Sequence, residues 1–350
     1  ANLPEPTISP ADDASPEDHF NTVTYTGTGS TRSVSGVGHQ PDFLWLKSRS
    51  GATVHVLYDV IRGGTNALRS NTTDAEAQYA DGVITFESDG FEIAGSSVGG
   101  INGSGESLVA WNWKANGSGV SNTDGSITST VSANTESGFS IVSYTGTGAN
   151  ATVGHGLDSA PDVIIAKNRD ASDNWCVYHS SLGETKTLRL NATIAAFTRT
   201  GSWNDTAPTS SVITIGTDSE VNTNTQDYIA YCFHSVEGFS KFGSYTGNGS
   251  ADGPFVYTGF RPAFVMVKRT DSASANGWYM WDSARSPYNV VQNTLNANGL
   301  YEDTTSQDCD FNSNGFKLRR NYQDFNASGG TYIFMAFSDA NGPFKYSNAR

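Results

Sequence analysis

The stretch Tyr25-Thr26-Gly27-Thr28-Gly29 returns twice in this 350-residue chain, and its three copies decide the fold. The other copies are Tyr144-Thr145-Gly146-Thr147-Gly148 and Tyr245-Thr246-Gly247-Asn248-Gly249. Each copy is followed by a proline and an apolar run that ends in lysine, namely PDFLWLK (41–47), PDVIIAK (161–167) and PAFVMVK (262–268). Lys47 follows its tyrosine by 22 positions, and Lys167 and Lys268 follow theirs by 23. Such constant spacing is the signature of an internal repeat.

Each unit of the repeat closes on an aromatic-rich run. The three runs are LVAWNW (108–113), YIAYCF (228–233) and YIFMAF (332–337). They place the units at residues 20–114, 139–237 and 238–341, each close to the usual size of one domain. We therefore expect three domains in tandem, with the three lysines on equivalent, central strands.

The pattern inside a unit predicts strands. Both alternating sets of side chains are apolar in residues 42–47, which indicates a central strand buried on both faces. Residues 86–91 and 311–316 carry Asp-Gly and Asn-Gly, the dipeptides of tight hairpins. Gly, Ser, Thr and Asn are abundant, which favours strands and turns over helices. The sequence predicts an all-β fold of three tandem β-sandwich repeats, jelly-roll or lectin-like.

Three segments lie outside the units. Residues 1–19 are rich in Pro and Asp and predict an extended assembly arm, ordered by a neighbouring subunit or another protein, with Pro4, Pro6, Pro10 and Pro16 as its stiff points. Residues 115–138 predict a Gly/Ser/Thr linker. Residues 342–350 predict a C-terminal strand, because GPFKY (342–346) echoes GFSKF (238–242).

Composition narrows the classes of function. A formal net charge of −14 excludes a typical nucleic-acid partner, since phosphate binding needs clustered Lys and Arg. No segment has the length and apolarity for membrane insertion. The cysteines, Cys176, Cys232 and Cys309, predict buried free thiols and folding in a reducing compartment.

Chemical motifs are few. DFNSNG (310–315) matches the start of a calcium loop but lacks the acidic twelfth residue, so a hairpin turn is the favoured interpretation. The histidines have no zinc spacing. We expect no metal, no cofactor and no enzymatic activity. Each repeated lysine is expected to extend its ammonium from a strand end into water.

Residues that differ between the units are the candidates for binding. Aromatic side chains beside Asn and Asp are typical of sugar-binding surfaces, because a ring stacks on a pyranose while polar groups bind hydroxyls. Core packing of the same aromatic residues is the alternative. The candidate glycan- or receptor-binding residues are Trp203, Asn204, Asp205, Tyr288, Tyr301 and Tyr322.

Several segments together resemble a known family. YTGTGS (25–30), VGHQPDFLWLKSRS (37–50), the run from LVAWNW (108–113) to IIAKNR (164–169), and YIFMAFSDANGPFKYSNAR (332–350) are similar to structural proteins of tailed, often marine, bacteriophages. The resemblance covers most of the chain. It implies a virion component, tail-fibre-like or more generally structural. Together with the repeated scaffold and the assembly arm, it leads us to expect a homo-oligomeric virion protein, assembled in the host cytoplasm, that recognises a glycan or protein on the host surface.

Two other functions remain open. One is a capsid decoration or head-fibre protein that stabilises the shell. The other is a depolymerase, which would need a pair of carboxylates flanking a glycosidic bond. The family brings no catalytic residues to carry over, and no such pair stands out in the sequence.

Overall fold

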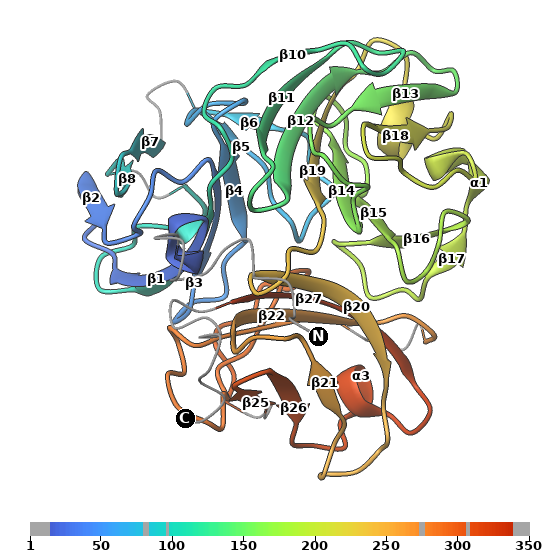
Figure 1. The fold of residues 1–350 in the computed structure, drawn as a ribbon. Coiled ribbons are helices and arrows are strands. Elements are labelled where there is room, and N and C mark those ends of the chain that lie inside the picture. Colours follow the sequence, from blue (N-terminus) through green and yellow to red (C-terminus); the bar gives the residue numbers. More distant parts are fainter. Residues whose placement is uncertain (1–14, 80–83, 96–97, 273–276, 306–308, 339–350) are drawn as a thin grey trace.

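The computed structural model describes residues 15–338 except 80–83, 96–97, 273–276 and 306–308. Strands dominate it, so the all-β prediction is confirmed (Figure 1). The few helical segments are single turns: η2 (Pro16–Asp18), η3 (Val98–Gly100), α1 (Thr200–Trp203), α2 (Ser219–Asn222) and α3 (Gln323–Asn326).

Three main sheets share one antiparallel strand order. The first has the order β1-β9-β3-β4, from β1 (Phe20–Thr26), β9 (Ser107–Trp113), β3 (Phe43–Ser48) and β4 (Val56–Asp59). The second contains β12 (Phe139–Thr145), β19 (Asp227–Phe233), β14 (Val163–Asn168) and β15 (Cys176–His179) in the same order, extended by β16 (Lys186–Arg189) and β17 (Phe197–Thr198). The third contains β20 (Ser240–Thr246), β27 (Thr331–Ser338), β22 (Pro262–Arg269), β23 (Trp278–Asp282) and β24 (Leu295–Asn296).

The repeated lysines hold the same place in these sheets. Each lies on the strand next to the closing strand, in register with an aliphatic residue of it. The pairs are Lys47 with Val109, Lys167 with Ile229 and Lys268 with Ile333. The constant offsets therefore predicted the position of these strands correctly.

A smaller sheet covers one face of each main sheet and completes a sandwich. The covering strands are β2 (Arg32–Ser35), β8 (Gly90–Ile93) and β7 (Ile84–Glu87) in the first unit, β13 (Ala151–Gly154) and β18 (Val212–Ile215) in the second, and β21 (Phe255–Tyr257), β26 (Gly315–Leu318) and β25 (Cys309–Asn312) in the third. A separate buried core fills each sandwich. Phe86 pairs with Phe91 and Phe311 with Phe316 across the two predicted hairpins. A short β5 (Asn66–Ala67) and β6 (Ala77–Gln78) form one further pair.

The Tyr-Thr-Gly copies fasten the first strand of each unit to the segment before the closing strand. Each tyrosine hydroxyl donates to a backbone carbonyl: Tyr25 to Ile101 (2.8 Å), Tyr144 to Val221 (2.8 Å) and Tyr245 to Phe325 (2.7 Å). The first glycine of each copy lies so close to another backbone segment that a Cβ placed on it would overlap a carbonyl oxygen: that of Gly103 for Gly27, of Thr223 for Gly146 and of Ala327 for Gly247. The motif thus repeats because close backbone contact requires glycine.

The other faces of the three main sheets pack against one another in a single shared core. Figure 1 shows the three sheets grouped around a common centre. The equivalent rings of Trp113, Phe233 and Phe337 meet there, with centroids 5.7 to 6.3 Å apart in all three pairs. Buried aromatic side chains stabilise a core by roughly 1.5–3 kcal/mol each. The units are therefore joined by a common core, in place of the three separate domains expected from size.

Two expected boundaries are corrected. The predicted linker 115–138 contains β10 (Val120–Asn122) and β11 (Ser129–Asn134), which extend the second main sheet beside β12. Val131 is buried there, in a run whose other residues are mostly Ser and Thr. At the N-terminus, Pro16 is buried in η2, and the His19 ring packs edge-on against Phe239 with ring centroids 5.8 Å apart. Residues 15–19 thus pack on their own chain, whereas Pro4, Pro6, Pro10 and residues 342–350 lie outside the described residues.

Candidate functional site

The repeated lysines are buried, so the expectation that they extend into water is wrong. All three are fully buried, and desolvation lowers the pKa of each to about 8. The ammonium groups donate to backbone carbonyls: Lys47 to Ser48 and Gly51, Lys167 to Thr73 and Ala171, and Lys268 to Thr193. Thr73 and Thr193 belong to the neighbouring units. For Lys167 and Lys268, a loop from the preceding unit therefore covers the strand end that the sequence pattern leaves open.

These covering loops begin at an asparagine in each unit. Its side-chain oxygen accepts from the backbone N–H that precedes or opens the fourth strand: Asn71 from His55 (3.0 Å), Asn191 from Trp175 (2.9 Å) and Asn298 from Trp278 (2.8 Å). Five residues later, a backbone N–H of the loop donates a hydrogen bond to a backbone carbonyl of the adjacent unit. The pairs are Glu76 N–H to Arg169 O (2.8 Å), Ala196 N–H to Thr270 O (2.9 Å) and Asp303 N–H to Arg49 O (2.8 Å). The three bridges close a ring. The recurring Leu-x-x-Asn at 68–71, 188–191 and 295–298 was the sequence signal for it.

Buried ion pairs reinforce two of the three seams. Arg62 contacts Asp59 (2.6 Å) and Glu76 (3.0 Å), and Tyr231 of the second unit donates to Asp59 (2.8 Å). Burial pulls the pKa of Arg62 down, but the neighbouring acids hold it above its usual value.

The seam between the third and first units repeats this arrangement. Arg285 contacts Asp282 (2.5 Å) and Asp303 (2.7 Å), and Trp111 of the first unit donates to Asp282 (3.0 Å). His179 stands in the equivalent place at the remaining seam, and burial lowers its pKa to about 4.

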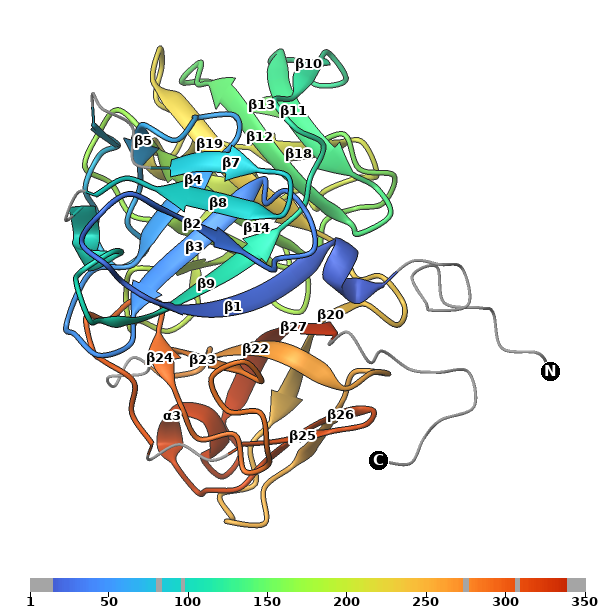
Figure 2. The same ribbon diagram turned by 90° about the vertical axis from the view of Figure 1, so that its left-hand side faces the viewer.

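A cleft of about 990 Å³ opens where the covering loops of all three units meet. Concave sites of this size are the usual location of bound ligands. Most of the residues that line it belong to the third unit, around β24 and α3. Figure 2 shows where these two elements lie in the fold. The residues that matter for its chemistry are Tyr279, Asn296, Tyr301, Tyr322 and Asp324.

Asp324 is the buried polar group of the cleft. Asp324 is only 2% exposed, and the Tyr279 hydroxyl donates a hydrogen bond to its Oδ2 at 2.5 Å. The other oxygen, Oδ1, has no hydrogen-bond partner among the described residues. Burial raises the pKa of Asp324, and the Tyr279 hydroxyl, Lys268 and Arg269 oppose that rise. An unpaired buried carboxylate oxygen is costly, which makes it a strong acceptor for a ligand hydroxyl.

Two tyrosine rings border the cleft. Tyr322 is 37% exposed and is held edge-on by Tyr279, with ring centroids 6.4 Å apart. Tyr301 is 68% exposed, and its ring lies 2.9 Å from where a Cβ of Gly299 would be. Glycine at 299 therefore makes room for the Tyr301 ring. Rigid rings of this kind supply contact area at low entropic cost.

The structure brings together two of the six candidate binding residues, Tyr301 and Tyr322. Trp203 is only 1% exposed and packs against Tyr178 in the core of its sandwich, as the alternative of core packing predicted. Asn204 and Asp205 lie on an exposed turn nearby, and Tyr288 is 83% exposed; none of these lines the cleft. Sequence reasoning missed Asp324 and Tyr279, because a single Asp in a polar stretch and a strand tyrosine carry no motif.

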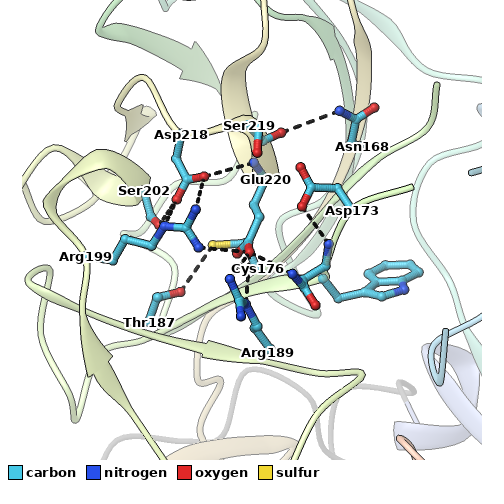
Figure 3. A network of polar contacts seen from close by, with 12 residues as sticks. Asn168, Asp173, Cys176, Thr187, Arg189, Arg199, Ser202, Asp218, Ser219 and Glu220 are labelled. Carbon is cyan, nitrogen blue, oxygen red and sulfur yellow. Dashed lines mark hydrogen bonds and ion pairs between the residues drawn. The ribbon is translucent and has the colours of Figure 1, made fainter. Parts of the chain in front are cut away.

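A second polar cluster lies inside the second unit (Figure 3). Glu220 is buried and accepts from Arg189 (2.5 Å) and Arg199 (2.9 Å), and Arg199 also pairs with Asp218. The nearby thiol of Cys176 donates to or accepts from Thr187 at 3.2 Å, and burial raises its pKa to about 12. A thiol with so high a pKa is a poor nucleophile. This closed cluster is part of the scaffold.

Metal and membrane sites find no support in the part of the chain that the structure describes. No group of three or more His, Cys, Asp or Glu side chains is arranged there to hold a metal ion. The calcium-like stretch at 310–315 is a hairpin in which Asn312 pairs with Gly315. Among those residues, no helix is long and apolar enough to cross a membrane.

Fold and cleft together define an all-β protein of three sandwiches locked around one core, with a ligand-sized cleft at their junction. The chain belongs to the family described as a domain of unknown function (DUF7483), whose model matches residues 15–341. A comparison with curated proteins finds no match.

Proposed function

We propose that this chain is a bacteriophage virion structural protein, tail-fibre-like, that recognises the host surface through the cleft. One observation carries the proposal: exposed Tyr301 and Tyr322 flank a buried Asp324 whose Oδ1 has no partner among the described residues. Stacking rings beside a hydrogen-bonding carboxylate are the features with which proteins bind sugars. The resemblance to phage structural proteins supports the virion assignment.

The cleft favours binding over hydrolysis. Glycoside hydrolysis requires two carboxylates that flank the scissile bond. Asp324 is the one carboxylate among the residues that line the cleft in the described part of the chain. We therefore propose that the protein is not an enzyme. Its contacts with other virion proteins are proposed to involve the residues that precede Ser15.

Adsorption of phage particles tests this function. Particles that lack the protein should fail to attach to host cells, and particles with Tyr301→Ala should attach weakly. Tyr288→Ala is the matched control, since Tyr288 is also exposed but lies outside the cleft. Normal attachment of particles without the protein, together with loss of DNA on heating, would instead establish a capsid decoration or head-fibre protein.

A further inference from the structure

The second and third units contain the same carboxylate position in two different states. Glu220 and Asp324 each stand two residues before an asparagine, Asn222 or Asn326, whose side chain accepts from the Tyr-Thr-Gly loop of its unit. Glu220 is neutralised by two arginines (Figure 3). Asp324 forms no ion pair within the described residues and keeps only the Tyr279 hydroxyl.

One substitution accounts for much of the difference. Arg189, which pairs with Glu220, lies opposite Cys176 in the register of β15 and β16. The residue in that register position in the third unit is Asn296, which lies opposite Tyr279. Asparagine is shorter than arginine and carries no charge. The space that the Arg189 guanidinium occupies in the second unit is therefore part of the cleft in the third unit, and Asn296 lines the cleft there.

The charge around Asp324 selects the ligand class. Asp324 is the one charged residue that lines the cleft in the described part of the chain, so an anionic ligand would meet a carboxylate and no cation. Lys268 and Arg269 lie close enough to lower the pKa of Asp324, so they already offset its negative charge. A cationic ligand is therefore not required. An uncharged hydroxyl can donate to Oδ1 without either cost.

We infer that the cleft binds a neutral, hydroxyl-rich hexose glycan, with one sugar hydroxyl donating to Asp324 Oδ1 and a ring face on Tyr322 or Tyr301. This inference rests on the proposed function and narrows its ligand. The register position that holds Arg189 in the second unit holds Asn296 in the third. This difference is the feature that opens the site.

Binding of defined oligosaccharides to the purified full chain tests the inference. The probes are neutral hexose tetrasaccharides of glucose, mannose and galactose, a tetragalacturonate, and a chitosan tetrasaccharide, each measured by calorimetry. We expect at least one neutral probe to bind, with affinity reduced at least tenfold by Asp324→Asn. Asn296→Arg should also reduce it at least tenfold, because the new guanidinium would pair with Asp324 as Arg189 pairs with Glu220. Tyr288→Ala should bind normally.

Each outcome decides between the two proposals. Tighter binding of the acidic or the amino-sugar probe, lost in Tyr301→Ala, would overturn the neutral class and leave glycan recognition standing. Failure of all probes to bind would overturn glycan recognition itself. Thermal unfolding shows whether each variant is folded; should Asn296→Arg fail to fold, Tyr301→Ala and Asp324→Asn still test the site. Neutral binding unchanged in both of those would place the ligand elsewhere and refute the inference.

Discussion

Replacing Lys167 by methionine should change how the stability of the protein depends on pH. Lys167 is fully buried, and desolvation lowers its pKa from the usual 10.5 to about 8. The folded chain therefore binds this proton less tightly than the unfolded chain does. Near pH 7 the charged lysine costs the folded state about 3 kcal/mol relative to an unperturbed lysine. That cost is relieved as pH rises from about 8 toward 10.5, so the free energy of unfolding should increase over that range.

The difference between the wild-type chain and Lys167→Met isolates this one group. Between pH 7 and pH 10 the wild-type free energy of unfolding should rise relative to that of the variant by about 2.5 kcal/mol. Near pH 7 the two should be similar, because the variant loses hydrogen bonds to Thr73 and Ala171 but also loses the buried charge.

Urea unfolding at half-unit steps of pH measures the effect. Lys241→Met is the control, since Lys241 is exposed on β20, and its profile should run parallel to that of the wild type. A parallel profile for Lys167→Met as well would show that the buried lysine keeps an ordinary proton affinity. The account of the covering loops as desolvating caps would then be wrong.

Two further changes test the scaffold by urea unfolding. Arg62→Met leaves Asp59 buried without its cation and should cost about 3–5 kcal/mol, whereas Arg69→Met, which removes a surface pair with Asp74, should cost under about 1 kcal/mol. Equal costs would argue against a structural role for the seam. Gly146→Ala should cost about 3 kcal/mol because its Cβ would overlap Thr223 O, while Gly201→Ala, with its nearest neighbour at 3.6 Å, should be tolerated. A tolerated Gly146→Ala would refute the explanation of the repeated glycine.

The central strands were predictable from sequence because local rules set them. Tyr25, Gly27 and Lys47 recur at fixed distances, and the apolar run between Pro41 and Lys47 identifies a strand buried on both faces. The linker was misjudged for a related reason. In residues 129–134 the buried positions include Ser129 and Ser132 as well as Val131, so the strand lacks the apolar alternation that a sequence pattern reveals.

The packing of the three units was not predictable, because it depends on long-range contacts. A strand such as β3 has the same sequence pattern whether its second apolar face meets a small sheet or two other units. The burial of the lysines follows from the same contacts. Thr73 and Thr193 accept hydrogen bonds from Lys167 and Lys268 of the next units across the seams. The residues close to these two lysines in the sequence do not predict those contacts.

The position of the cleft follows from the way a pseudo-symmetric scaffold is modified. Three equivalent loops meet at one end of the shared core. In a fully symmetric molecule, each loop would cover the carboxylate position of its own unit. Gly100, Glu220 and Asp324 occupy that position in the three units. The first unit has no acid there, the second pairs its acid with two arginines, and the third leaves its acid without an ion pair among the described residues, beside Tyr301 and Tyr322. The interlocked ring holds the backbone in place, so side chains can change in one unit without loss of the fold. Binding chemistry is therefore expected where the units differ, and the repeated residues maintain the frame that positions it.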